Sequence, residues 1–260
     1  MEKLSRIIII PYMHFDEKSA LGFNFSGVVS VNDTYLEKRE YLLYFSGSLL
    51  PKTAPFRAIF KEVCDLNWEL VGHGWFQESL RVADNEELVI KKSLKLLREL
   101  SGQPVRSWFG PGGGETENTP ELLKDNGIEF LHDWLIDELP CWMRTKSGPL
   151  LAMPYTFELN DVPIWTVQNN SCDEMYKRVN ATLEVFDEEK LSNTKIITLA
   201  LHPHIVGVPQ NFHYFKKTIQ ELRKRDDVTF MTSSQIGDWF IKEEGTNGES
   251  LIPYLTSPPN

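Results

Sequence analysis

Two histidines stand where a side chain could do acid–base chemistry, each directly after a run of apolar residues. His73 follows residues 68–72 and lies between two glycines, whereas His202 follows residues 195–201 and precedes a proline. Such a run is typical of a buried strand whose last side chain emerges into a loop. An imidazole there titrates near neutral pH and can act as a general acid, a general base or a metal ligand. A histidine at a strand end is also often only a structural hydrogen-bond partner.

Carboxylates accompany these histidines. His14 and Asp16 follow an apolar run near the N-terminus, and Asp133 and Asp137 follow another one. One carboxylate with two imidazoles could hold a divalent metal that activates water. For Asp133 and Asp137, the capping of an ordinary loop is an equally good interpretation.

The run of glycines at residues 110–114 follows a further strand-like stretch. It lacks the lysine and the Ser/Thr of a P-loop and the spacing of a dinucleotide fingerprint, which argues against nucleotide binding. The backbone N–H groups near Gly112 could instead stabilise an oxyanion. Arg106, at the start of this stretch, is either an orienting residue or an anchor for a neighbouring carboxylate.

Several tryptophans lie near the ends of the predicted strands, where they could line a pocket, although core packing explains most of them equally well. The residues that we select as substrate-binding candidates are Trp75, Trp108, Pro111, Gly112, Asp133 and Trp134.

Parallel strands are expected to position all of these residues, because ligand sites in α/β barrels lie at the carboxyl ends of the strands. We predict strands at residues 6–12, 41–45, 68–72, 105–109, 128–131, 150–155, 164–167, 195–201 and 228–231. We predict helices at residues 54–67, 84–100, 119–127, 173–190, 214–225 and 233–243. Asn85 can cap the second of these helices, and Gly102 suits the left-handed position at its end.

Length and composition indicate one α/β domain. The chain has 260 residues, 41% of them hydrophobic, and we expect a single barrel at residues 1–244 followed by a loosely held tail at 245–260. The net charge of -10 at pH 7 argues against nucleic acid and anionic membranes as partners. Three cysteines without a Cys-x-x-Cys pair argue against a zinc–thiolate site and favour a reducing cytosol.

Several motifs occur together in this chain: Gly72 to Gln77, Arg-x-Trp-x-Gly-Pro-Gly from Arg106, Asp-Trp-x-x-Asp-x-x-Pro from Asp133, Pro-Tyr-x-x-Glu-x-Asn-Asp from Pro154 and Leu-His-Pro-x-x-x-Gly from Leu201. Together they resemble the polysaccharide deacetylase (NodB-homology) superfamily, and in particular its branch of cofactor-independent allantoinases and cytoplasmic peptidoglycan-deacetylase-like proteins. The resemblance implies a variant (β/α) barrel of about seven parallel strands, distorted near the N-terminus, with its site at the carboxyl-end face. It also implies a cytoplasmic homo-oligomer.

The resemblance assigns roles to individual residues. The catalytic candidates are His14, His73, His202, Arg106 and Asp161, and the metal-ligand candidates are Asp16, His73 and Gln77. Family deacetylases carry two aspartates where this chain has His14 and Asp16, and a His-x-x-x-His motif where it has His73 and Gln77. Because glutamine is a poor, neutral ligand for zinc, we expect either no cofactor or a weakly bound divalent metal such as zinc.

These features favour a hydrolase that cleaves a non-peptide C–N bond in a small amide, a cyclic amide such as a hydantoin, or an N-acetyl group. The alternative is a deacetylase-fold protein that has lost turnover and binds a small ligand. The changed residues at positions 14 and 77 favour the alternative, and the two histidines at strand ends favour the enzyme.

Overall fold

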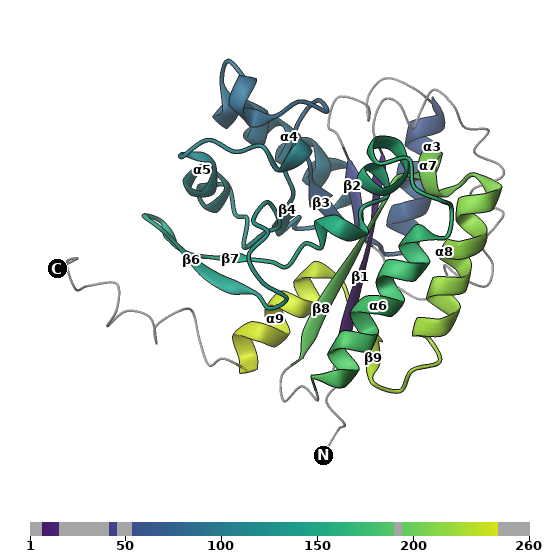
Figure 1. Ribbon diagram of the computed structural model, residues 1–260. Helices are drawn as coiled ribbons and strands as arrows, with labels where there is room; N and C mark the ends of the chain where they lie inside the picture. The colour runs from purple at the N-terminus through teal and green to yellow at the C-terminus, as the bar shows by residue number, and fades with distance from the viewer. Residues whose placement is uncertain (1–6, 16–41, 46–53, 190–193, 244–260) are drawn as a thin grey trace.

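The sheet of this protein has nine strands in the computed structural model, which describes residues 7–15, 42–45, 54–189 and 194–243 (Figure 1). Its order is β6-β7-β5-β4-β3-β2-β1-β8, and β9 also pairs with β1. All pairings are parallel except that of β6 with β7. The strands are β1 (Ile7–Phe15), β2 (Leu42–Phe45), β3 (Glu69–Gly72), β4 (Ser107–Trp108), β5 (Phe130–Leu131), β6 (Cys141–Thr145), β7 (Gly148–Ala152), β8 (Lys195–Leu201) and β9 (Val228–Phe230).

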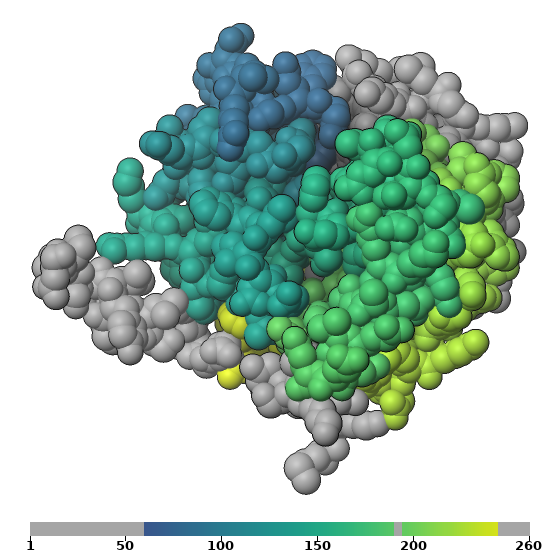
Figure 2. All heavy atoms as spheres, viewed as in Figure 1, coloured from purple at the N-terminus to yellow at the C-terminus, as the bar shows by residue number. Residues whose placement is uncertain are grey.

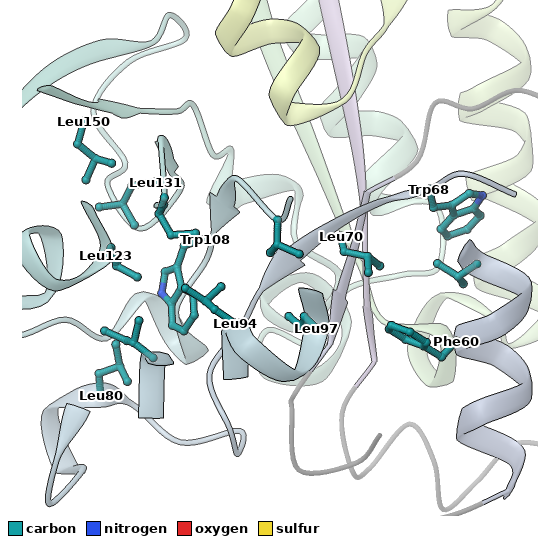
Figure 3. Close-up of a cluster of buried hydrophobic side chains, with 14 residues drawn as sticks. Phe60, Trp68, Leu70, Leu80, Leu94, Leu97, Trp108, Leu123, Leu131 and Leu150 are labelled. Carbon is teal, nitrogen blue, oxygen red and sulfur yellow. The ribbon is translucent and has the colours of Figure 1, made fainter. Parts of the chain in front are cut away.

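Helices surround the sheet. They are α3 (Ala54–Asp65), α4 (Glu86–Ser101), α5 (Thr119–Asp125), α6 (Glu174–Glu188), α7 (Pro203–Val206), α8 (Pro209–Leu222) and α9 (Ser233–Glu243). One hydrophobic cluster joins α3, α4 and α5 to β3, β4 and β5, with Trp108 near its centre (Figure 3). A second cluster joins α6 and α8 to β8, and Figure 2 shows these two helices forming one continuous surface.

The predicted ends of α4 are confirmed. The Asn85 side chain accepts a hydrogen bond of 2.9 Å from the Leu88 N–H at the start of the helix. Gly102 ends it with φ of 69°, a left-handed conformation that costs little without a Cβ atom.

The two ends of the sheet are joined through residues 154–161, which we call the closing segment. The Thr198 N–H of β8 donates to the Thr156 hydroxyl over 3.1 Å, and the Thr198 hydroxyl donates to the Pro154 carbonyl over 3.0 Å. Asn160 also forms a parallel bridge with Ala200. Because the closing segment follows β7, these contacts bring β7 and β8 together around a barrel, as predicted.

Helix α9 lies at the amino end of the strands, opposite α7 (Figure 1). Ile236 and Phe240 of this helix pack into the cluster that contains Phe130 and Ile196 on the inner side of the sheet. None of the helices in the described residues has an apolar stretch long enough to cross a membrane.

Two elements differ from the sequence prediction. The prediction of a strand at residues 164–167 is wrong, because Val162–Val167 forms a π-helix with Pro163 in its first turn. β6 was not predicted, and it pairs antiparallel with β7 so that Thr145 lies opposite Gly148. The predicted tail at residues 245–260 and the expected distortion near the N-terminus lie outside the described residues.

A buried polar network fixes α9 below the strands. His132 Nε2 lies 2.7 Å from the Ser233 hydroxyl, and the Ser107 hydroxyl donates to Ser233 over 2.9 Å. Ser234 donates to the Glu69 carboxylate through its N–H and its hydroxyl. His132 is fully buried, so the imidazole is held here in its neutral form.

We expect acid to destabilise the protein through His132. Burial lowers the pKa of His132 to about 3, although a hydrogen bond with the Pro154 carbonyl opposes this shift. An unfolded histidine titrates near pH 6.5. Between about pH 6.5 and about pH 3 the unfolded chain therefore binds a proton that the folded chain does not, and the free energy of unfolding falls as the pH falls.

Urea denaturation at a series of pH values measures this dependence. His132→Gln removes the titrating group, and its stability is expected to decline less steeply over this window than that of the wild type. His213→Gln, at an exposed position of α8, is the matched control. Parallel declines in the wild type and His132→Gln would contradict the prediction.

Candidate active site

The clearest candidate for acid–base chemistry is the pair formed by Asp161 and His202. Asp161 Oδ2 accepts the backbone N–H of His202 over 2.6 Å, and Asp161 Oδ1 lies 2.6 Å from His202 Nδ1. Asp161 is fully buried, and the His202 side chain is 12% exposed. Burial raises the pKa of Asp161, and its hydrogen bonds with His202 oppose that rise. An ionised Asp161 accepts Nδ1–H, so Nε2 is the ring atom that can exchange a proton.

Local structure explains why this pair forms. Asn160 accepts the Val162 N–H over 2.8 Å with its side-chain oxygen, and its side-chain nitrogen donates to the Tyr155 hydroxyl over 2.7 Å. These bonds, with the bridge to Ala200, hold the closing segment against β8. The Asp161 carboxylate is thereby placed at the carboxyl end of β8, where His202 begins α7.

His73 follows β3 and uses both ring nitrogens within the site. Nδ1 contacts the carbonyl oxygen of Phe109, and Nε2 lies 3.0 Å from Oε1 of Gln77. A carbonyl oxygen only accepts, so Nδ1 carries a hydrogen. Nε2 then either donates to Gln77 Oε1 as part of an imidazolium or accepts from the Gln77 amide in its flipped orientation. In both cases Gln77 occupies the nitrogen that a metal would bind.

A stack of three rings runs from His73 to Tyr155, whose hydroxyl accepts from Asn160, the residue before Asp161. The Phe109 ring stacks on His73 with centroids 5.6 Å apart and on Tyr155 with centroids 4.5 Å apart. Burial raises the pKa of Tyr155, and the charges of Asp161 and Asp133 raise it further. The sequence analysis did not select Phe109 or Tyr155, although Tyr155 lies within the motif at residues 154–161.

The glycine turn lies between these residues and Asp133. Gly112 and Gly113 have φ of 64° and 61°, which is the left-handed region that favours glycine. Gly113 and Gly114 donate their N–H groups inside the turn, whereas the Gly112 N–H has no hydrogen-bond acceptor among the described residues. Asp133 holds the start of the turn by accepting the Gly110 N–H over 2.6 Å. Pro111 is buried beneath the turn.

The remaining candidates are placed as follows. His14 of β1 pairs with Tyr44 of β2, and the preceding residue Met13 pairs with Leu201 of β8. The backbone of His14 therefore lies level with the start of the His202 loop. Asp16 lies outside the described residues. Trp134 is 43% exposed, as a residue at the rim of a site would be. The ring of Trp75 is covered by the Lys92 ammonium of α4, at 3.7 Å from the ring centroid.

Two predicted roles need correction. Trp108 is fully buried in the cluster under α4 and α5 (Figure 3), so it is a core residue and does not contact substrate. Arg106 pairs with Glu129 and with Asp238 of α9, at the amino end of the strands. These hydrogen bonds raise the pKa of Arg106. Arg106 is therefore an anchor for carboxylates, and not a residue that orients substrate beside His202.

The donor atoms in the described residues do not fit a tight zinc site. Structural and catalytic zinc sites use at least three protein ligands, mostly imidazole, thiolate or carboxylate. No three side chains of His, Cys, Asp or Glu converge on one point within the part of the chain that the structure describes. At His73 the neighbouring ligand position holds the neutral amide of Gln77, which is a poor zinc ligand.

We expect wild-type protein to bind less than one zinc per chain and Gln77→His to bind more. The substitution adds a second imidazole four residues after His73, and imidazole is a strong zinc ligand. Titration against a chromogenic chelator measures the affinity. The double variant His73→Ala, Gln77→His is the control, and it should return zinc binding to the wild-type level. Equal zinc affinity in the wild type and Gln77→His would contradict the prediction.

Comparison with known proteins bears out the resemblance to the polysaccharide deacetylase superfamily. A provisionally named polysaccharide deacetylase of Schizosaccharomyces pombe is 29% identical over 191 residues, which are 65% of this chain and 59% of that protein. The match thus spans less than two thirds of that relative's length. The peptidoglycan deacetylase of Helicobacter pylori is 23% identical over 219 residues, which are 72% of this chain and 75% of that protein. No protein-family model matches the chain.

Solved structures share the fold. The PuuE allantoinase has a TM-score of 0.80 at 17% identity, covering 93% of this chain and 92% of that one. A provisionally named polysaccharide deacetylase from Pseudomonas aeruginosa PAO1 has a TM-score of 0.78 at 20% identity, covering 93% of both chains. A CE4 family pseudoenzyme from Bacillus anthracis has a TM-score of 0.54 at 12% identity, covering 88% of this chain and 65% of that one. The fold is therefore the NodB-type deacetylase barrel.

Proposed function

We propose that the protein hydrolyses a non-peptide C–N bond in a small amide, a cyclic amide or an N-acetyl compound. The observation that carries this proposal is the buried Asp161 carboxylate, which holds the His202 imidazole through two hydrogen bonds of 2.6 Å at the carboxyl end of β8. A histidine oriented in this way is suited to move a proton during acyl transfer.

The reaction needs one proton to pass through Nε2 of His202. As water attacks the carbonyl carbon, Nε2 takes a proton from it, and Asp161 stabilises the imidazolium that forms. The C–N bond then breaks as Nε2 returns the proton to the leaving nitrogen, giving a carboxylic acid and an amine. The N–H of Gly112 is a candidate donor to the oxyanion of the tetrahedral intermediate. His73, together with Asp16, is proposed to position the attacking water, which requires Gln77 to release Nε2 of His73.

A small or cyclic amide is favoured over a polysaccharide. The PuuE allantoinase has the highest TM-score of the structures described above. The names of the two relatives instead favour an N-acetyl group on a polysaccharide or peptidoglycan, so both substrate classes belong in the test.

The test is a substrate panel of allantoin, hydantoins, dihydropyrimidines, N-acetyl sugars and N-acyl amines. We expect turnover of at least one compound without added metal. Release of amine or acetate is measured for the wild type and for His202→Ala, with circular dichroism to check that the variant is folded. Turnover that His202→Ala leaves unchanged would contradict the proposal.

The second candidate function is binding without turnover. It is favoured by the occupation of His73 Nε2 by Gln77 and by the likeness in fold to the CE4 family pseudoenzyme. Isothermal titration with the same panel distinguishes the two functions. Saturable binding without any turnover, weakened by Trp134→Ala, would favour the binding protein.

A further inference from the structure

Asp133 and Glu115 lie close together under the glycine turn, and each has an oxygen that lacks a hydrogen-bond donor. Asp133 Oδ1 accepts the Gly110 N–H over 2.6 Å, and Glu115 Oε2 accepts the indole N–H of Trp134 over 2.9 Å. The other two oxygens, Asp133 Oδ2 and Glu115 Oε1, are inaccessible to solvent and have no donor within the described part of the chain. Asp133 Oδ2 also lies over Gly110, where a Cβ atom would come within 2.9 Å of it.

A single proton supplies the missing donor. Two neighbouring carboxylates in a desolvated place cannot both remain ionised, because their charges repel and each ion loses hydration. Burial raises the pKa of Asp133 well above its usual range and raises that of Glu115, and the two groups interact with each other. One carboxyl group that stays protonated would donate to the other and satisfy both buried oxygens.

We propose that Glu115 is a positioning residue, which shares one proton with Asp133 and so holds the turn at residues 110–114 against the loop that carries Trp134. The shared proton closes a chain of contacts from the Gly110 N–H through Asp133 and Glu115 to the Trp134 indole. These contacts fix both the candidate oxyanion donor at Gly112 and the rim of the site. Their role in catalysis therefore rests on the proposed function.

The surrounding charges act on the pair from three further elements. Arg81 donates to the backbone carbonyl of Glu115 over 2.7 Å, and its charge lowers the pKa of Glu115. Glu86 at the start of α4 raises that pKa, although its carboxylate is bound by the hydroxyls of Thr116 and Thr119. In the closing segment, the charge of Asp133 contributes to the raised pKa of Tyr155.

The sign of the pH dependence follows from the raised pKa of the pair. Below the ordinary carboxyl range of about pH 4 both the folded and the unfolded chain hold the proton. As the pH rises above that range, the unfolded chain releases the proton and the folded chain keeps it, so the stability that the shared proton contributes is lost progressively until the folded pair also ionises.

The first experiment needs no substrate. Infrared difference spectra of the wild type should contain the carbonyl stretch of a protonated carboxyl group at neutral pH. Glu115→Gln should lack that band, because its amide N–H replaces the shared proton and leaves Asp133 ionised. Its urea stability should also fall less with rising pH than that of the wild type. Glu117→Gln changes an exposed glutamate two residues further on, and it should match the wild type in both measurements.

The second experiment uses whichever substrate the panel yields. We expect the wild type to lose activity at alkaline pH as the pair ionises. Glu115→Ala should lower kcat by up to about 10²-fold, the effect of a misplaced loop, whereas Glu115→Gln should keep kcat near the wild-type value and should not show the alkaline loss. The proposal is overturned if the protonated band is absent from the wild type, if the band persists in Glu115→Gln, or if added sodium or magnesium stabilises the wild type but not Glu115→Gln, which would indicate a bound cation. If no substrate is turned over, the first experiment still tests the shared proton. Failure of the proposed function can therefore be distinguished from failure of the shared-proton proposal.

Discussion

Replacement of His202 by alanine is expected to lower kcat by roughly 10²–10⁴-fold, the usual contribution of a positioned general acid or base. Asp161→Asn should also lower kcat, because an amide stabilises the imidazolium less than a carboxylate does and no longer fixes the tautomer of His202. KM should change little in both variants if the imidazole acts mainly on the transition state. Steady-state kinetics on the substrate from the panel measures these effects.

The exposed His213 offers a matched control, since His213→Ala removes an imidazole from α8 at a distance from Asp161. It should retain wild-type kinetics. If His202→Ala raised KM without lowering kcat, His202 would be a binding residue and the acid–base mechanism would be wrong. If His213→Ala and His202→Ala lost activity equally, the loss would not be specific to the proposed pair.

Replacement of Trp108 by alanine is expected to lower the free energy of unfolding by about 3–5 kcal/mol, the usual cost of removing a large buried aromatic side chain. Trp108 is fully buried, and its ring fills the space beside Gly72, where an added Cβ atom would collide with it. Urea denaturation measures the loss.

Trp134→Ala is the comparison, because the Trp134 side chain is 43% exposed and makes one hydrogen bond with Glu115. It should change stability far less than Trp108→Ala and should act mainly on ligand binding. Normal stability with weakened substrate binding in Trp108→Ala would contradict the core role. It would support the substrate-binding role that the sequence analysis predicted for Trp108.

Elements that depend on local signals were predictable from the sequence. The boundaries of β8 and α9 are those expected, and α4 has the predicted cap at Asn85 and the predicted end at Gly102. Each has a long periodic or β-branched run with a clear stop signal nearby. A single sequence contains that information, because the residues that start and stop the element are its own neighbours.

Short apolar runs were less informative. Residues 164–167 look like a strand. However, Asn160 binds the Val162 N–H and Pro163 favours a helical start, so residues 162–167 fold into a π-helix. The strand at Cys141–Thr145 was missed in the sequence prediction. The turn before Gly148 is a hairpin signal that the prediction did not use.

For the site, only the residues at the carboxyl ends of the strands were predictable from the sequence. The carboxyl ends of parallel strands bring His73 and His202 to the same edge, and the motif before β8 contained Asp161. The anchor role of Arg106 was one of the two predicted alternatives, but its partner Asp238 could not be predicted because it lies 132 residues away in the sequence. The unpaired oxygens of Glu115 and Asp133 likewise become visible only when the packing around them is known.

The closing segment has a consequence for the integrity of the candidate site. The same eight residues that join β7 to β8 also carry Asp161 and the Asn160 side chain that binds Tyr155. Local opening of a protein tends to involve contiguous units that are less stable than the whole. A single opening event between β7 and β8 would therefore separate Asp161 from His202 and take apart the proposed proton-transfer pair.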